Sequence, residues 1–164
     1  MSQEPLDATS FSSDALDFLV VLHKHDVRYM IVGGEAVIYY GYARVTGDID
    51  IFYDGSQTNA EHLFAALEEF WQGKVPGVRG PAELMPSGTI VQFGVPPNRI
   101  DLINRIAGVS FAKAWPRRLR ACVRVAGQKV PLWYLGLGDL LRNKRAAGRP
   151  KDLADLAFLQ RRNR

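Results

Sequence analysis

The chain has 164 residues, a formal net charge of +4 and a single cysteine, Cys122. The length suits one domain, and the 47% share of hydrophobic residues argues against wholesale disorder. One cysteine excludes an internal disulfide framework and a cysteine-based zinc cluster. The N-terminus lacks the basic and apolar segments of a secretory signal, and no apolar run is long enough to span a bilayer. We therefore expect a cytoplasmic protein without a membrane partner.

The net charge conceals an uneven distribution along the chain. Residues 1–112 carry 7 Lys and Arg against 14 Asp and Glu, whereas residues 113–164 carry 14 against 3. Carboxylates in the acidic body suit a metal site, and cations in the basic end suit a polyanion such as a nucleotide or RNA. A solvated basic surface on two helices is the simpler alternative, and charge alone favours it.

The predicted elements alternate between helices and short strands. Residues 1–11 are rich in Ser, Thr and Asp and are expected to form a flexible leader. Helices are expected where apolar residues recur three and four positions apart, and strands where they run together or alternate with polar residues. In the first half of the chain we expect a helix over 15–26, a strand over 29–32, a helix over 35–42, a strand over 48–53 and a helix over 58–72. An irregular loop over 73–87 is expected to lead into strands over 89–95 and 99–106 and a helix over 110–119. Strands over 122–125 and 129–133 and helices over 139–147 and 150–161 are expected to complete the chain.

Hairpins that alternate with helices predict an α+β fold rather than a wholly parallel sheet. We expect a short mixed β-sheet with helices packed on one side and a basic helical C-terminus that closes over a cleft. The expected organisation is a core over residues 12–135, on which a C-terminal helical pair over 136–164 is packed.

Two acidic residues on the strand over 48–53 are the most informative feature. Since side chains two positions apart share one face of a strand, Asp48 and Asp50 point the same way, about 6.5–7 Å apart along the strand. Ile49 and Ile51 then point into the core. Two carboxylates on one face repel each other unless water or a cation lies between them, and Mg²⁺ prefers oxygen ligands. The pair therefore suits a magnesium site, and two hydrated carboxylates on an exposed strand are the alternative.

Two companions strengthen the metal interpretation. Gly33 and Gly34 follow a strand and precede a helix, where glycine lets backbone N–H groups approach a phosphate and the helix N-terminus favours anions. An ordinary strand-to-helix turn is the alternative. Asp101 lies in the middle of an apolar strand, where an acid is costly unless it is paired or ligates a metal. If this strand lies beside Asp48, a third carboxylate joins the pair.

The segment Gly-Gly-Glu-Ala … Arg-Val-Thr-Gly-Asp-Ile-Asp, with a later strand-borne aspartate, resembles the DNA polymerase β-type nucleotidyltransferase superfamily. With Arg-Asn-Lys-Arg-Ala-Ala-Gly-Arg-Pro-Lys-Asp near the end, the chain is also similar to small bacterial AbiEii-like nucleotidyltransferase proteins. The resemblance covers residues 29–54, 98–103 and 139–156. It implies the nucleotidyltransferase fold and an enzyme that moves a nucleoside monophosphate from an NTP to a hydroxyl, with pyrophosphate leaving.

The resemblance also implies roles for individual residues. Asp48, Asp50 and Asp101 would be the catalytic carboxylates and would bind two Mg²⁺ ions, and Asp101 would help to deprotonate the acceptor hydroxyl. Gly33 and Gly34 would hold the triphosphate. Gly-Gly replaces the superfamily's commoner Gly-Ser, which removes one hydroxyl contact.

Four further residues are candidates for binding the nucleotide. Arg44 and Thr46 precede the acid pair, and they either contact the nucleotide or shape the loop. Lys144 falls where the similar small proteins carry a basic residue that faces the triphosphate. Lys151 lies at the same junction between two helices, and a solvated helix surface is the alternative for both lysines.

A second basic run, Pro116–Arg120, has two interpretations. It is either an RNA-facing patch or, more simply, a helix end that neutralises its own dipole. Trp71, Trp115 and Trp133 are expected to pack in the core.

The sequence leaves the acceptor open between RNA (including a tRNA end), a protein side chain and a small molecule. The resemblance implies a toxin-like role with a cognate antitoxin or another partner protein. Two alternative functions remain: an antibiotic-modifying nucleotidyltransferase, and a nucleotide-binding or partner-binding module that does not catalyse.

Overall fold

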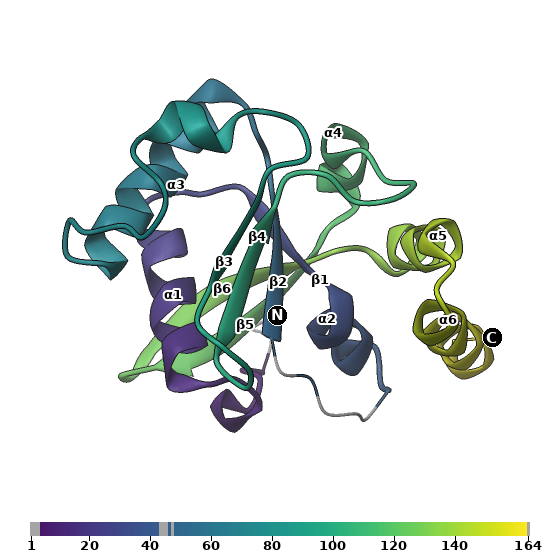
Figure 1. The fold of residues 1–164 in the computed structure, drawn as a ribbon. Helices are drawn as coiled ribbons and strands as arrows, with labels where there is room; N and C mark the ends of the chain where they lie inside the picture. The colour runs from purple at the N-terminus through teal and green to yellow at the C-terminus, as the bar shows by residue number, and fades with distance from the viewer. Residues whose placement is uncertain (1–3, 43–45, 47, 164) are drawn as a thin grey trace.

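The computed structural model describes residues 4–42, 46 and 48–163. Six strands form one mixed sheet in the order β3-β4-β2-β1-β6-β5 (Figure 1). β2 pairs in parallel with β4 and antiparallel with β1, which in turn pairs in parallel with β6, while β3–β4 and β5–β6 pair antiparallel. The strands are β1 (Tyr29–Val32), β2 (Asp48–Tyr53), β3 (Ile90–Phe93), β4 (Arg99–Ile103), β5 (Leu119–Val125) and β6 (Gln128–Tyr134).

The two long helices of the core begin at serine N-caps. Ser12 and Ser56 each accept a hydrogen bond from a backbone N–H in the first turn, which satisfies a donor that the helix leaves free. Short 3-10 turns, η1 (Ala8–Ser10), η2 (Pro81–Leu84) and η3 (Trp115–Arg117), complete the connections. The helices are α1 (Ser13–Lys24), α2 (Gly33–Tyr39), α3 (Gln57–Phe70), α4 (Phe111–Ala114), α5 (Leu137–Ala147) and α6 (Pro150–Arg162).

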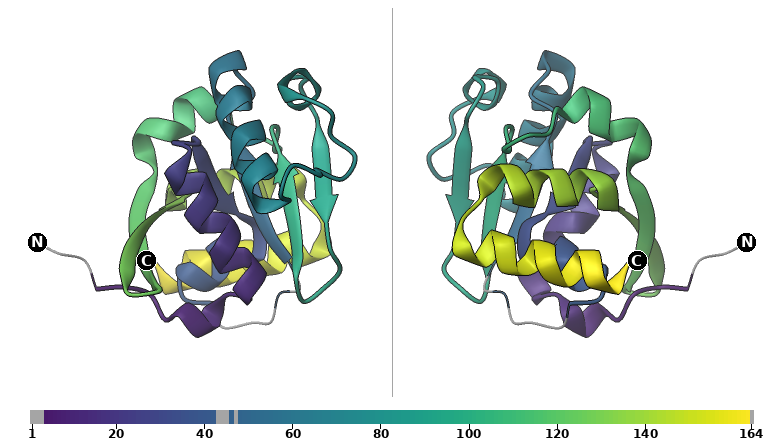
Figure 2. Two further views of the ribbon diagram at one scale, coloured as in Figure 1. Left: turned by 90° about the vertical axis from the view of Figure 1, so that its left-hand side faces the viewer. Right: turned by 90° about the vertical axis from the view of Figure 1, so that its right-hand side faces the viewer.

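The basic C-terminal helices α5 and α6 lie side by side across the molecule (Figure 2). Gly148 ends α5 in the left-handed conformation, with φ +65°, and Pro150 occupies the first turn of α6, as suits a tight junction. The ring of Phe158 on α6 meets the ring of Tyr42, just after α2, with centroids 4.2 Å apart. The C-terminal pair is therefore held near the end of α2.

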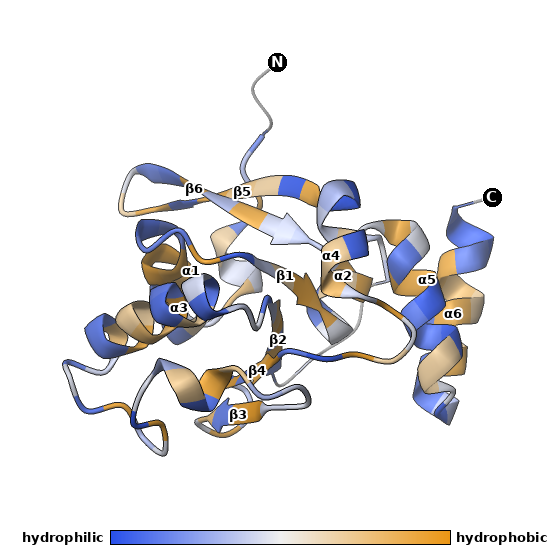
Figure 3. Cartoon of the chain, turned by 90° about the horizontal axis from the view of Figure 1, so that it is seen from above, coloured by the Kyte–Doolittle hydropathy of each residue, from blue (hydrophilic) through white to orange (hydrophobic). Residues whose placement is uncertain are grey.

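Helices flank both faces of the sheet. Seen from above, α1 and α3 lie on one side, and α2, α4, α5 and α6 lie on the other (Figure 3). We call these the α1 face and the α2 face. The alternation predicted for β2 is present over its first four residues, since Ile49 and Ile51 are buried while Asp48 and Asp50 keep partial access to solvent, and it ends where Phe52 and Tyr53 are both buried. Each fully buried apolar side chain of this kind contributes about 1.5–3 kcal/mol to folding.

The N-terminal residues contact the sheet. The Leu6 N–H donates to the Cys122 carbonyl at 2.7 Å, so Leu6 forms a parallel bridge beside β5. Phe11, at the end of the same stretch, is buried in the core. No helix in residues 4–42, 46 and 48–163 is both long and apolar enough to cross a lipid bilayer.

The predicted α+β class, with its mixed sheet and basic helical C-terminus, is confirmed. The expectation of helices on one side of the sheet is wrong (Figure 3), because the α2 face also carries apolar side chains that must be buried, among them Met30 and Phe52.

One predicted helix was also too long. The helix expected over 110–119 ends at Ala114 and passes through η3 into β5. Pro116 offers no N–H to the carbonyl of Ala112, so the helical ladder stops there. Leu119 and Arg120 consequently belong to a strand.

Candidate functional site

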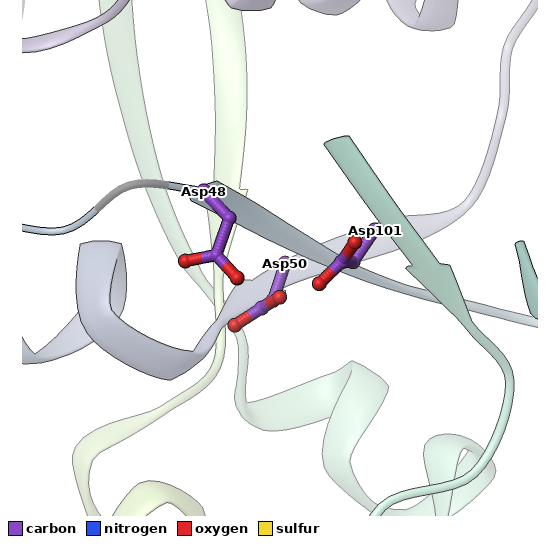
Figure 4. Close-up of side chains that lie close together, drawn as sticks. All are labelled: Asp48, Asp50 and Asp101. Atoms are coloured by element: carbon purple, nitrogen blue, oxygen red, sulfur yellow. The ribbon is translucent and has the colours of Figure 1, made fainter. Parts of the chain in front are cut away.

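Three aspartates from two neighbouring strands meet on the α2 face (Figure 4). In the parallel pairing of β2 and β4, Asp50 stands opposite Asp101 and Asp48 stands opposite Arg99, so all four side chains share one face. One carboxylate oxygen from each aspartate lies within 4.8 Å of the other two. The structure thus brings together the three carboxylates that the sequence singled out.

The proximity of these carboxylates changes their acidity. Burial, followed by the charges of Asp48 and Asp101, raises the pKa of Asp50 to about 7. The pKa of Asp101 is also raised, chiefly by burial. Burial opposes ionisation of Asp48 too, but hydrogen bonds from Arg99 and Thr46 outweigh it and hold the pKa of Asp48 below its usual range. The site therefore favours the protonated forms of Asp50 and Asp101 more than water does, whereas Arg99 and Thr46 favour ionised Asp48.

Arg99 is a site residue that sequence reasoning missed. Its Nη2 donates to Asp48 Oδ2 at 2.7 Å, and its Nε lies 3.4 Å from Asp101 Oδ1. The side chain is 34% exposed, so it reaches the carboxylates from the solvent side. Its position two residues before Asp101 on a strand was the available signal, because that spacing places both side chains on one face.

Glu35 was missed as well. It lies in the first turn of α2 with 9% of its surface exposed, and burial together with the charge of Asp48 raises its pKa to about 7. Glu35, Asp48 and Arg99 line a cavity of about 360 Å³ that η1 and the turn between β3 and β4 also border. An acidic residue directly after the diglycine, in an otherwise apolar helix, was the signal for it.

Gly33 is required by the packing of Asp50. Its φ of +66° lies in the left-handed region, and a Cβ there would collide with the Asp50 carboxyl group, whose Cγ would be 3.0 Å away. Gly34 follows it as a buried residue of α2. The diglycine thus lets the start of α2 approach the carboxylate cluster closely, and its contact with a triphosphate stays a prediction.

The two predicted lysines occupy different environments. Lys144 is 3% exposed, and its Nζ lies 3.3 Å from Asp152 Oδ1 and 3.1 Å from Asp155 Oδ2. This environment does not favour the predicted contact between Lys144 and a triphosphate, which stays a prediction, because the charge of Lys144 is buried and neutralised between α5 and α6. Lys151 is exposed at the start of α6, and its positive charge lowers the pKa of Asp50. Lys151 therefore lies close enough to the carboxylate cluster for its charge to act on Asp50.

The loop before the acid pair is only partly described. Arg44 lies outside the described residues. The Thr46 hydroxyl donates to Asp48, with Oδ1 at 3.1 Å and the carbonyl oxygen at 3.2 Å. Thr46 therefore orients a carboxylate of the cluster, which supports the loop-shaping interpretation.

The chain is similar to proteins described as nucleotidyltransferases. A family model for a nucleotidyltransferase of unknown function (DUF6036) matches residues 13–159. Similar solved structures include a protein of Thermotoga maritima described as a candidate nucleotidyltransferase, with a TM-score of 0.56, 16% identity and coverage of 96% of this chain and 97% of that one. Another is an antigenic nucleotidyltransferase-like protein of Paracoccidioides brasiliensis, with a TM-score of 0.50, 19% identity and coverage of 91% and 77%.

No curated protein matches the chain significantly. At these identities the two solved structures bear on the fold alone, and they confirm the predicted nucleotidyltransferase fold.

Proposed function

The chain belongs to the DUF6036 family of nucleotidyltransferases, and from that premise we propose that it moves a nucleoside monophosphate from an NTP to a hydroxyl acceptor, using Mg²⁺. The observation that carries this proposal is the convergence of Asp48, Asp50 and Asp101, whose oxygens lie within 4.8 Å of one another. Family and fold support nucleotidyl transfer in general, and the metal and the acceptor are our proposals.

The donor set suits Mg²⁺. All three side chains offer carboxylate oxygens, which are the ligands that hard divalent cations prefer. Asp101 Oδ1 is buried and accepts no hydrogen bond within residues 4–42, 46 and 48–163. Asp48 and Asp50 would hold two ions, and Asp101 would ligate one of them. Bound Mg²⁺ would neutralise charge on the transferring phosphoryl group.

Each protein group then has a defined task. Asp101 would accept the proton of the attacking hydroxyl. Lys151 would attract the triphosphate from the start of α6, and the backbone of Gly33 and Gly34 would border it. Arg99 forms an ion pair with Asp48. If a cation bound to Asp48, the guanidinium of Arg99 would exchange this carboxylate for solvent or a phosphate oxygen. Such a site works mainly through positioning and charge neutralisation.

The acceptor and the biological setting form the finer part of the proposal. The acceptor hydroxyl belongs to RNA or tRNA, to a protein side chain or to a small molecule. The AbiEii-like segments support a toxin-like role in the cytoplasm with a cognate antitoxin. An antibiotic-modifying enzyme is the alternative within the same chemistry.

The test is a search for transferred label. Purified protein, Mg²⁺ and each α-labelled NTP are added to a lysate, and RNA, protein and small-molecule fractions are analysed by mass spectrometry for nucleotidylylated products. We expect the α-phosphate label, and not a γ-phosphate label, to enter one fraction, and EDTA to prevent this. Mg²⁺-dependent NTP binding without transfer to any fraction would instead establish a non-catalytic nucleotide-binding module.

Metal binding is expected to depend on pH in a direction that Asp50 sets. Its pKa of about 7 lies above the value of an unfolded aspartate, so the folded protein binds more protons between these pH values and loses stability as pH rises through them. A cation that binds only when Asp50 is ionised offsets this loss of stability. Mg²⁺ should therefore raise the melting temperature more above pH 7 than well below it, as measured by differential scanning fluorimetry against EDTA. An equal shift at both pH values would contradict the assignment.

A further inference from the structure

Arginine and tryptophan side chains gather where η3 meets the β5–β6 hairpin. The Arg118 guanidinium lies 3.7 Å from the ring centroid of Trp115 and 4.6 Å from that of Trp133. Arg28 lies 5.7 Å from the Trp115 ring, and Arg120 lies 5.8 Å from the Trp133 ring. We call these five residues the Arg–Trp surface.

The β5–β6 hairpin, which carries Arg120 and Trp133, lies at one end of the sheet (Figure 3). Arg120 and Trp133 are register partners and therefore share one face of β5 and β6. The residues next to them, Ala121 and Leu132, are buried on the other face. A hollow of about 320 Å³ opens there and is lined by Arg28, Trp115, Arg120 and Trp133 among others.

The arginines of this surface lack carboxylate partners. Within the described parts of the chain, none of Arg28, Arg118 and Arg120 forms an ion pair, although neighbouring Arg117 is paired with Asp139 at 2.8 Å. Asp26 also lines the hollow, beyond ion-pair distance of the three arginines. Burial and the nearby charge of Arg28 lower the pKa of Arg118. Arg118 Nε is buried and donates no hydrogen bond to any described residue. Positive charge is thus concentrated here without internal compensation.

We propose that the Arg–Trp surface is a binding site for single-stranded nucleic acid, whose phosphates contact the arginines and whose bases stack on the Trp133 ring and on guanidinium planes, since the Trp115 ring already stacks on Phe111 and carries Arg118. Unpaired arginines supply the charge that a phosphate backbone requires, and aromatic rings beside them accept bases of any sequence. An acidic peptide would satisfy the arginines but would leave the Trp133 ring without a stacking partner. The Pro116–Arg120 run therefore joins a binding surface instead of serving only as a helix end.

The position of the surface relates it to the carboxylates. Phe52 lies two residues after Asp50 on β2, so its side chain shares the face of Asp50. The ring centroids of Phe52 and Phe111 are 5.1 Å apart, and the Phe111 ring stacks on the Trp115 ring with centroids 5.5 Å apart. The Arg–Trp surface therefore lies on the same face of the sheet as Asp48, Asp50 and Asp101. Binding can be measured without NTP or metal, so the outcome is independent of the proposed function.

The test measures binding of fluorescein-labelled single-stranded RNA and DNA oligonucleotides of mixed sequence to the full chain at low salt. We expect both to bind and to quench tryptophan fluorescence. The double substitution R28Q/R120Q should weaken binding about tenfold and reduce the slope of log K against log salt by about 1.4, since each phosphate contact contributes about 0.7 with single strands. The matched control is K74Q/R79Q, which removes two exposed charges from the loop after α3 and should change binding less than about twofold.

Three results would overturn the proposal. These are no binding at low salt, equal weakening by the two double variants, and binding of polyglutamate as tight as that of the oligonucleotides without quenching. The conservative variant W133F, which keeps an aromatic ring, should retain more affinity than W133L at equal melting temperature. Equal affinities of these two variants would remove the stacking component and with it the assignment to nucleic acid.

Discussion

Replacing Asp50 with asparagine is expected to lower nucleotidyl transfer by about a thousandfold, a loss typical of removing a charged group from a preorganised phosphoryl-transfer site. Asp50 lies between Asp48 and Asp101 and rests against Gly33, so its carboxylate is central to the cluster. An amide has nearly the same shape but cannot supply the negative charge that two cations need. The measurement is transfer of α-labelled NTP at saturating Mg²⁺.

The same substitution should stabilise the metal-free protein. At pH 8 the wild-type protein has to ionise a carboxyl group whose pKa is raised to about 7, whereas asparagine carries no charge to bury. The melting temperature in EDTA should therefore rise while activity falls, which separates a lost metal ligand from a damaged fold. D17N, on the exposed surface of α1, is the matched control and should change neither quantity. Full activity in D50N would refute the metal assignment.

Replacing Lys144 with methionine is expected to lower the free energy of unfolding by about 3–5 kcal/mol, the usual result of removing one partner from a buried ion pair. The Lys144 ammonium lies between two carboxylates whose side chains are each 1% exposed, Asp152 on the first turn of α6 and Asp155 on the next. Without it, both buried carboxylates lose a cationic partner, and Arg149 still pairs with Asp152 at 2.6 Å. For a chain of this size the melting temperature should fall on the order of 10 °C.

Two controls decide whether Lys144 acts through the fold or through the nucleotide. K151M removes an exposed charge of the same kind, so it should leave the melting temperature almost unchanged while weakening NTP binding. K144M/D155N removes one of the two facing carboxylates and should recover part of the lost stability. If K144M weakened NTP binding at unchanged stability, Lys144 would contact the nucleotide, as the sequence resemblance implies. That result would refute the stabilising role assigned here to its buried ion pairs.

Local patterns in the sequence were sufficient for most of the secondary structure. The alternation of Asp48 to Tyr53 specified a strand and also which side chains leave the core, because the side-chain period of a strand is fixed at two. Apolar spacing predicted the first helix over 15–26, and the Ser12 side chain caps the first turn of α1 in the structure. Gly148 and Pro150 separated α5 from α6 through their backbone preferences. Periodicity was less reliable where Pro116 interrupts it.

The sequence by itself determined the strands, most helices and the acid pair Asp48 and Asp50, because those depend on residues a few positions apart. Only the tertiary structure decided that β4 lies beside β2 and places Asp101 opposite Asp50, since strand neighbours 51 residues apart are chosen by the packing of the whole sheet. It also decided that Lys144 is buried against α6 and that three arginines surround two tryptophans. The sequence gives the charge of a side chain, but the partner of that charge depends on which surfaces pack against each other and exclude water.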